Sequence, residues 1–424
     1  MRAPTNLTLP AWIKSCPNLE DPVDGCAAHW PRRYPRNASD SAEPPVLLFT
    51  LFKNVRIADL LRFLEYHLLL GVDRAILVDN SCGAHAAASK AALAPYVEAG
   101  IVQHFTQFVC VEMRSMMFMQ NFRGGSSMAR QLSGMRDIPK GAFIISLDDD
   151  EYLALSDPHA TLQHMRRELV RKRICAVTLT WRVYGSSGHR CHPDGPLIRR
   201  FTRRAMTEPE VEASSTRRAR SSKAAAQHEA SLRHLNTPFG GKPLYVYEEA
   251  TMPMCGTHWC DECPNGLANC ATPRGAGEIC ERKFDLTPMR FWINHYAFQS
   301  LQHWEGKKVR GRTNQLPSRT GGVPRSYERL LDHEALYLLI KRLERIKAPR
   351  LRTCLTRLFD GANEAWHSQV EVPAAVEADP AWSARAERAN AMARATTAHA
   401  KPSRDATAGV SATTSAGTRS VPDF

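Results

Sequence analysis

Four consecutive acidic residues, Asp148 to Glu151, directly follow the short apolar run 142–147. Such a run predicts a buried strand whose carboxyl end carries the carboxylates. Side chains alternate along extended backbone, so Asp148 and Asp150 can point the same way while Asp149 points away. Neighbouring carboxylates repel one another, and a hard divalent cation that prefers oxygen ligands resolves that conflict. The spacing therefore predicts Mn²⁺ or Mg²⁺ at Asp148 and Asp150; the competing interpretation is a solvated acidic turn with Asp149 as a helix N-cap.

The elements that would position these acids alternate between strand and helix. Strands are predicted at Val46–Phe52, Arg74–Val78, Ile101–Phe105 and Ala142–Leu147, and helices at 57–68, 86–99 and 126–135. Alternation of this kind implies an α/β fold, Rossmann-like, with a mostly parallel twisted sheet and helices on both faces. Ligands of such sheets bind beyond the carboxyl ends of the strands, where Asp79 and Asp148 both lie.

The rest of the chain divides by composition. Further strands are predicted at Ala176–Tyr184, Leu244–Tyr247 and Phe291–Tyr296, and a helix at Ser326–Ile346. We therefore expect one α/β domain over residues 46–350, preceded by a Pro-rich stem or linker at 1–45. Residues 205–235 form a low-complexity insert, residues 255–280 a Cys-rich loop, and the Ala/Ser/Thr-rich tail at 372–424 is expected to be disordered.

The chain is basic, with 56 Lys and Arg against 43 Asp and Glu and a net charge of +13 over 424 residues. Much of this excess is local, in the Ser/Ala-rich stretch that contains Arg217, Arg218, Arg220 and Lys223. No compact basic stripe interleaved with aromatic residues is present, so we do not expect a nucleic-acid partner. A basic cleft suits an anionic nucleotide-sugar donor equally well.

The sequence contains no apolar run of the length that a membrane span needs. Two sequons, at Asn6 and Asn37, lie in the Pro-rich segment and favour the lumen of the secretory pathway. We therefore expect a Golgi or secretory protein whose membrane association depends on an anchor not visible in this chain, with a cytoplasmic protein as the alternative.

Five of the 12 cysteines crowd together with His258: Cys255, Cys260, Cys263, Cys270 and Cys280. Disulfides that tie a loop in an oxidising compartment are the preferred interpretation. A structural zinc ion held by Cys260, Cys263 and two more ligands is the alternative, although a second close pair is missing.

Several short motifs follow one another along residues 46–312. They are Lys53-Asn54, Glu65-Tyr66-His67, Asp79-Asn80-Ser81, Asp148-x-Asp150-Glu151-Tyr152, Tyr184-Gly185-Ser186-Ser187-Gly188-His189, Phe201-Thr202-Arg203-Arg204 and Asn294-His295-Tyr296. In this order and spacing the chain resembles glycosyltransferase family 92 and its relatives in the family 2-like superfamily, which have the GT-A fold. The departures are Val55, where an acid is usual after Asn54, and the insert at 205–235.

The resemblance implies an inverting hexosyltransferase that moves galactose from its uridine diphosphate carrier onto a glycan hydroxyl. Donor contacts would come from Lys53, Asp79, Asp148, Lys307 and Arg310. The metal ligands would be Asp148, Asp150 and a distal histidine, for which His295 is preferred to His258. Asp79 can instead form an Asx turn, and the distal basic residues can lie on a solvated helix face.

An inverting transfer needs a general base, for which Glu248, Glu249, Asp261 and Glu305 are the candidates. Trp181 and Tyr184 can stack on a sugar or pack in the core. Ser187 and His189, in or beside the glycine-flanked turn, can approach donor or acceptor. The alternative functions are a metal-dependent phosphotransferase or nucleotidyltransferase, for which a P-loop is absent, and an inactive glycan-binding protein.

Overall fold

The computed structural model describes residues 11–16, 23–31, 43–106, 141–205, 241–246, 263, 268–270, 291–310, 330–332 and 334–360. The chain divides into two compact units, Met1–Trp366 and His367–Phe424, and all described residues belong to the first. The predicted helix at 126–135, nearly all of the insert at 205–235 and the tail at 372–424 lie outside the described residues.

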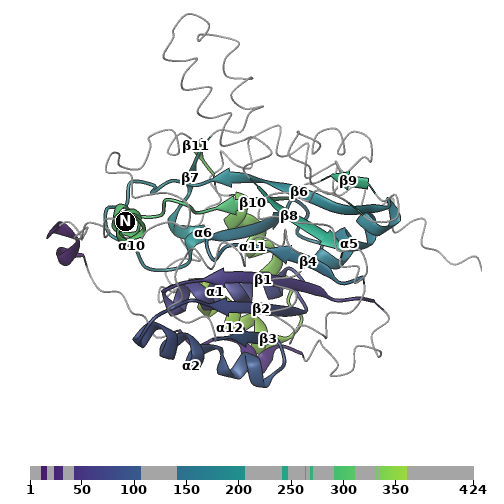
Figure 1. Ribbon diagram of the computed structural model, residues 1–424, viewed down its shortest axis with the longest axis horizontal. Coiled ribbons are helices and arrows are strands. Elements are labelled where there is room, and N and C mark those ends of the chain that lie inside the picture. Colours follow the sequence, from purple (N-terminus) through teal and green to yellow (C-terminus); the bar gives the residue numbers. More distant parts are fainter. Residues whose placement is uncertain are drawn as a thin grey trace, which may run out of the picture. The chain divides into compact units, whose positions relative to one another are not determined.

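Four parallel strands form one half of the main sheet (Figure 1). In spatial order they are β3 (Val102–Phe105), β2 (Arg74–Asp79), β1 (Val46–Phe52) and β4 (Phe143–Ser146). Strands buried on both faces have nearly continuous apolar sequences, as β1, β2 and β4 do. For that reason the sequence predicted these three strands to within one residue at either end, and its prediction of β3, which is less apolar, is equally close.

The other half of the sheet is mixed. It continues from β4 through β8 (Gly241–Val246), β6 (Ile174–Val183), β10 (Phe291–His295) and β5 (Glu151–Leu155). Strand β8 is antiparallel to both of its neighbours, and β5 is antiparallel to β10, whereas β6 and β10 are parallel. The short strand β9 (Ala268–Cys270) also pairs with β6. The predicted α/β class is therefore confirmed, with a mixed sheet.

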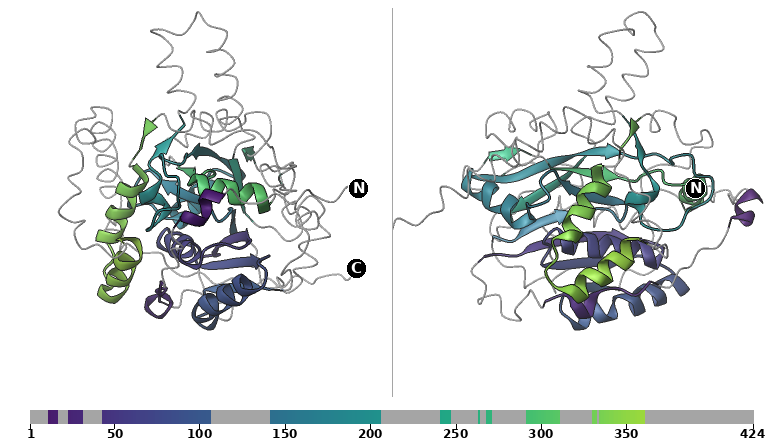
Figure 2. Two further views of the ribbon diagram at one scale, coloured as in Figure 1. Left: turned by 90° about the vertical axis from the view of Figure 1, so that its left-hand side faces the viewer. Right: turned by 180° about the vertical axis from the view of Figure 1, so that it is seen from behind.

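The helices pack around this sheet. They are α1 (Ile57–Leu69), α2 (Ala84–Glu98), α5 (Leu162–Arg171), α6 (Leu197–Arg200), α10 (Leu301–Arg310), α11 (Glu334–Glu344) and α12 (Pro349–Asp360), with 3₁₀ turns η1 (Ala11–Ser15) and η2 (Ala27–His29). Helix α1 contacts α2, α12 and β5 and is buried from Ala58 to Leu68, so its charged side chains need internal partners. Seen from behind in Figure 2, the yellow-green helices α11 and α12 lie across the sheet.

The helix predicted at Ser326–Ile346 begins later than expected. Leu330 and Leu331 instead form strand β11, which pairs with β7 (Arg203–Arg204). The Asp332 carboxylate binds Arg204 and accepts the backbone N–H of Glu334 at 2.8 Å. Asp332 thus satisfies the first N–H of α11, which starts at Glu334.

The folded unit extends beyond the expected bounds of 46–350 on both sides. A disulfide joins Cys26 to Cys354 in α12, and Cys26, Ala27 and Trp30 are buried in the main core. The buried carboxylate of Glu65 in α1 accepts the backbone N–H of Cys26 and the indole N–H of Trp30. Part of the segment expected to be a stem is therefore built into the domain.

Candidate active site

The order of the parallel strands creates a reversal beside the acidic residues. The chain moves outward from β1 to β2 and β3, then returns to place β4 on the other side of β1. In open α/β sheets, ligands bind at the carboxyl ends of the strands that flank such a reversal. These ends carry Lys53 and Asn54 after β1 and Asp148 after β4. The predicted donor residues Lys53 and Asp148 therefore both border the reversal.

The acids form a tight turn between β4 and β5. The backbone N–H of Glu151 donates to the carbonyl of Asp148 at 3.0 Å, and the Glu151 carboxylate accepts the N–H of Asp148 at 2.8 Å. Glu151 is fully buried, whereas the Asp148 side chain is about one third exposed. Glu151 thus stabilises the turn from the protein interior, and the Asp148 carboxylate is partly exposed to solvent.

His295 approaches Asp150 from a distant part of the chain. Strand β10 pairs with β5 so that His295 lies opposite Glu151, and the N–H of Tyr296 donates to the carbonyl of Asp150. This pairing brings Nε2 of His295 to 3.5 Å from Oδ1 of Asp150. The ring of Trp181, on neighbouring β6, lies 4.6 Å from the imidazole. The predicted metal residues Asp150 and His295 are therefore brought together.

Lys242 is the residue of this site that sequence reasoning missed. It lies on β8, and its Nζ is 2.9 Å from Oδ2 of Asp148 and 3.6 Å from Oε2 of Glu151. Burial alone would lower the pKa of Lys242, but the two carboxylates outweigh burial and raise the pKa above its ordinary value. The available signal was a lysine within the otherwise apolar run Gly241–Val246.

Asp79 ties two strand ends together. Its carboxylate is buried and accepts the N–H of Ser81 at 2.7 Å and the hydroxyl of Ser89 at 2.8 Å, and His104 lies 3.4 Å away. Burial would raise the pKa of Asp79, but the hydrogen bonds of His104, Ser81 and Ser89 outweigh it and lower the pKa. The Ser81 hydroxyl in turn accepts the N–H of Asn54. Asp79 thus forms an Asx turn with Ser81, and its contact with a donor stays a prediction.

The predicted sugar contacts have different surroundings. Tyr184 is buried and packs on Tyr296 with ring centroids 4.8 Å apart, whereas Trp181 is partly exposed beside His295. The Ser187 hydroxyl accepts the backbone N–H groups of Thr202 and Arg203 at 2.9 Å. The His189 imidazole contacts the carbonyl of Arg200 at 3.1 Å. Trp181 is therefore the member of this group that lies directly beside the Asp150–His295 pair.

Helix α10 carries Glu305, Lys307 and Arg310. Glu305 is partly exposed; the side chains of the two basic residues lie outside the described part of the structure, as do Glu248, Glu249, Asp261 and His258. The start of α10 is anchored by Ser300, whose hydroxyl accepts the N–H of His303 at 3.1 Å. The backbone N–H of His192 also donates to the Gln302 side chain at 2.8 Å.

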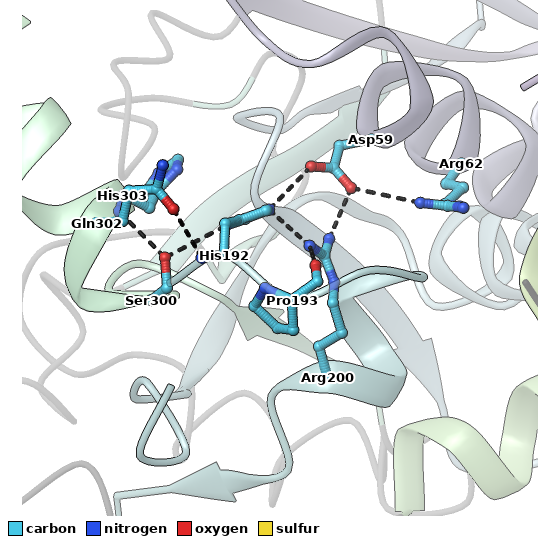
Figure 3. A network of polar contacts seen from close by, with 8 residues as sticks. All are labelled: Asp59, Arg62, His192, Pro193, Arg200, Ser300, Gln302 and His303. Carbon is cyan, nitrogen blue, oxygen red and sulfur yellow. Dashed lines mark hydrogen bonds and ion pairs between the residues drawn. The ribbon is translucent and has the colours of Figure 1, made fainter. Parts of the chain in front are cut away.

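A buried polar network connects this anchor to α1 (Figure 3). His192 lies between Ser300, at 3.4 Å, and Asp59, also at 3.4 Å. Arg200 donates to Asp59 at 2.7 Å and contacts Nε2 of His192 at 2.5 Å. Burial lowers the pKa of His192 despite the nearby Asp59, so the imidazole is neutral and can accept from Arg200. The network fixes α10 relative to α1, and Ser300 is fully buried within it.

Two ligands for a cation meet at this site. Within the described ranges, no group of three or more His, Cys, Asp or Glu side chains is arranged to hold a metal ion. Asp150 and His295 offer one oxygen and one nitrogen, and Mg²⁺ sites of this kind use one or two carboxylates together with substrate phosphates. These two ligand atoms therefore fit a cation that is bound jointly with a nucleoside diphosphate.

No protein-family model and no curated protein matches the chain. None of the helices in the described part of the chain is both long and apolar enough to cross a membrane.

Proposed function

We propose that the protein is a GT-A-type glycosyltransferase of the family 92-like group. It transfers a hexose, galactose from uridine diphosphate galactose, onto a glycan hydroxyl with inversion and requires Mn²⁺ or Mg²⁺. The full GT-A architecture, with helices on both faces of the sheet, is part of this proposal.

The meeting of Asp150 and His295 supports this proposal most strongly. The two residues come from separate strands and converge beside the sheet reversal, where α/β proteins bind phosphorylated ligands. Both side chains are only slightly exposed, so their charges act in a partly desolvated site.

The residues around this pair have distinct roles in the proposal. Of the three expected metal ligands, Asp150 and His295 would hold the cation, whereas Asp148, bound to Lys242, would border the donor together with Lys53. When bound, the cation stabilises the charge that develops on the leaving diphosphate. Trp181 offers a ring for a sugar face. Glu305, Glu249 and Asp261 remain the candidates that would accept the proton of the acceptor hydroxyl.

Disulfides support the proposed location in the secretory pathway. Three disulfides connect described residues: Cys16–Cys191, Cys26–Cys354 and Cys175–Cys263. Such bonds form and persist in oxidising compartments. We therefore propose a Golgi or other secretory lumen as the site of action.

A screen of sugar nucleotides for Mn²⁺-dependent hydrolysis tests this function. We expect one uridine diphosphate sugar to be hydrolysed by the wild-type protein. Asp150→Asn keeps size and shape but removes the charged ligand, and should lower turnover by about 10²–10³-fold, as for the loss of one electrostatic contact in other enzymes. Asp149→Asn is the matched control and should retain activity. Hydrolysis by Asp150→Asn at the wild-type rate would refute the assignment of this site.

A further inference from the structure

Lys242 occupies a place that rarely tolerates a charge. Strand β8 is buried at every position, and only 2% of Lys242 is exposed. The strand lies between β4 and β6, in the interior of the sheet rather than at its edge. Burying an ammonium group costs several kcal/mol unless carboxylates compensate for the loss of water. The position of Lys242 therefore requires negative partners.

Those partners are two of the clustered acids. Nζ of Lys242 lies 2.9 Å from Asp148 and 3.6 Å from Glu151, and Glu151 also accepts the backbone N–H of Asp148. These contacts close a triangle that holds the backbone and the side chain of Asp148. Asp150 instead has its carboxylate directed to His295. Three of the four clustered acids are thus divided into a lysine-bound pair, Asp148 and Glu151, and a histidine-facing carboxylate, Asp150.

We propose that Lys242 is a positioning residue that makes this division. Its single positive charge compensates the carboxylate of Asp148, the nearer partner, and holds it beside Glu151, which leaves Asp150, with His295, as the protein ligands of a divalent cation. The inference rests on the proposed function for the identity of that cation. Without the ammonium group, the charge of Asp148 would be uncompensated beside that of Asp150, and Asp148 would become available as a further ligand.

Titration of the protein with Mn²⁺ alone tests this division. Electron paramagnetic resonance measures the concentration of free Mn²⁺ at each step, so the test does not depend on enzymatic activity. We expect Lys242→Met to bind Mn²⁺ about tenfold more tightly, because a positive charge near the ion is lost. Adding Asp148→Asn to that variant should abolish the gain, whereas Asp148→Asn alone should not tighten binding, because it removes a negative charge and leaves the ammonium group unpaired. Lys341→Met, which removes an exposed lysine paired with Glu344, is the matched control.

Two results would overturn the inference. One is an unchanged Mn²⁺ affinity in Lys242→Met. The other is that Asp148→Asn changes the Mn²⁺ affinity by the same factor whether Lys242 is present or replaced. If Lys242→Met does not fold, Lys242→Met/Glu151→Gln carries the same test, since it removes the buried carboxylate that lost its partner. As a second readout, saturating Mn²⁺ should raise the melting temperature of the lysine variant more than that of the wild type.

The titration also separates this inference from the proposed function. Mn²⁺ binding to the wild type with no change in Lys242→Met refutes only the role of Lys242. Binding to Lys242→Met but not to the wild type supports that role and shows that the natural protein needs a further ligand, such as the nucleoside diphosphate of the proposed function, to hold the cation. Absence of binding to both proteins refutes the role of Lys242 only, and the screen of sugar nucleotides then decides the proposed function, in which the cation is bound jointly with a nucleoside diphosphate.

Discussion

The carboxylate of Asp150 lies 3.5 Å from Nε2 of His295, across the pairing of β5 with β10. Neither side chain depends on a long loop for its position, because Asp150 immediately precedes β5 and His295 ends β10. Groups supported by paired strands are held more precisely than groups on loops. The metal assignment can therefore be tested one ligand at a time.

We expect His295→Ala to raise the Mn²⁺ concentration needed for half-maximal activity and to lower turnover, because the variant loses the nitrogen ligand. Loss of groups that merely orient a ligand costs about 10–100-fold in metal affinity, and loss of the ligand itself should cost at least as much. His258→Ala is the matched control and should have the smaller effect. A greater effect of His258→Ala would reverse the choice between the two histidines.

Removal of the Cys26–Cys354 disulfide should destabilise the folded unit by about 2–5 kcal/mol. This bond spans 328 residues and lies in the core, whereas Cys16–Cys191 spans 175 residues and its cysteines are partly exposed. We therefore expect the double alanine variant of the first pair to unfold at lower denaturant concentration than that of the second. Equal midpoints in urea would show that the longer cross-link has no special role.

Glu65 should make stability depend on pH. Burial raises the pKa of Glu65 above its ordinary value of 4.5, although Tyr96, Trp30 and Cys26 donate hydrogen bonds to it. A raised pKa in the folded state means that stability is fully present below pH 4.5 and is lost as the pH rises through the folded-state pKa.

The measurement is urea unfolding of the wild type and of Glu65→Gln across this range. Because glutamine does not titrate, the free energy of unfolding of the wild type relative to the variant should fall as the pH rises above 4.5. A constant difference, or one that grows with pH, would contradict the buried-carboxylate interpretation.

Cys263 should be found in a disulfide and not at a zinc ion. The sequence left both possibilities open, and the structure joins Cys263 to Cys175 on β6. Peptide mapping without reductant should recover these two cysteines in one cross-linked peptide, and chelators should leave the melting temperature unchanged. Stoichiometric zinc in the purified protein, together with a fall in melting temperature on chelation, would favour the metal instead.

The sequence by itself determined the parallel half of the sheet and the place of the acids. The strands β1, β2 and β4 are nearly continuous apolar runs, and such runs mark strands that are buried on both faces. The same reasoning placed Asp79 and Asp148 at strand ends. The local sequence pattern is sufficient to predict these strands because each of them is buried on both faces and therefore has to be apolar along its length.

Only the tertiary structure decided how the polar residues are paired. Asp79 is satisfied by Ser89 and His104, and Asp148 is bound by Lys242, 94 residues later in the sequence. Tyr184, which directly follows β6, packs in the core, while Trp181 on β6 reaches His295. The contacts of Asp148 with Lys242 and of Trp181 with His295 depend on the positions at which β8 and β10 enter the sheet, β8 antiparallel to β4 and β10 antiparallel to β5. A sequence specifies which residues must be buried, but the register of distant strands decides which charges meet, since one residue of slip turns every side chain to the other face.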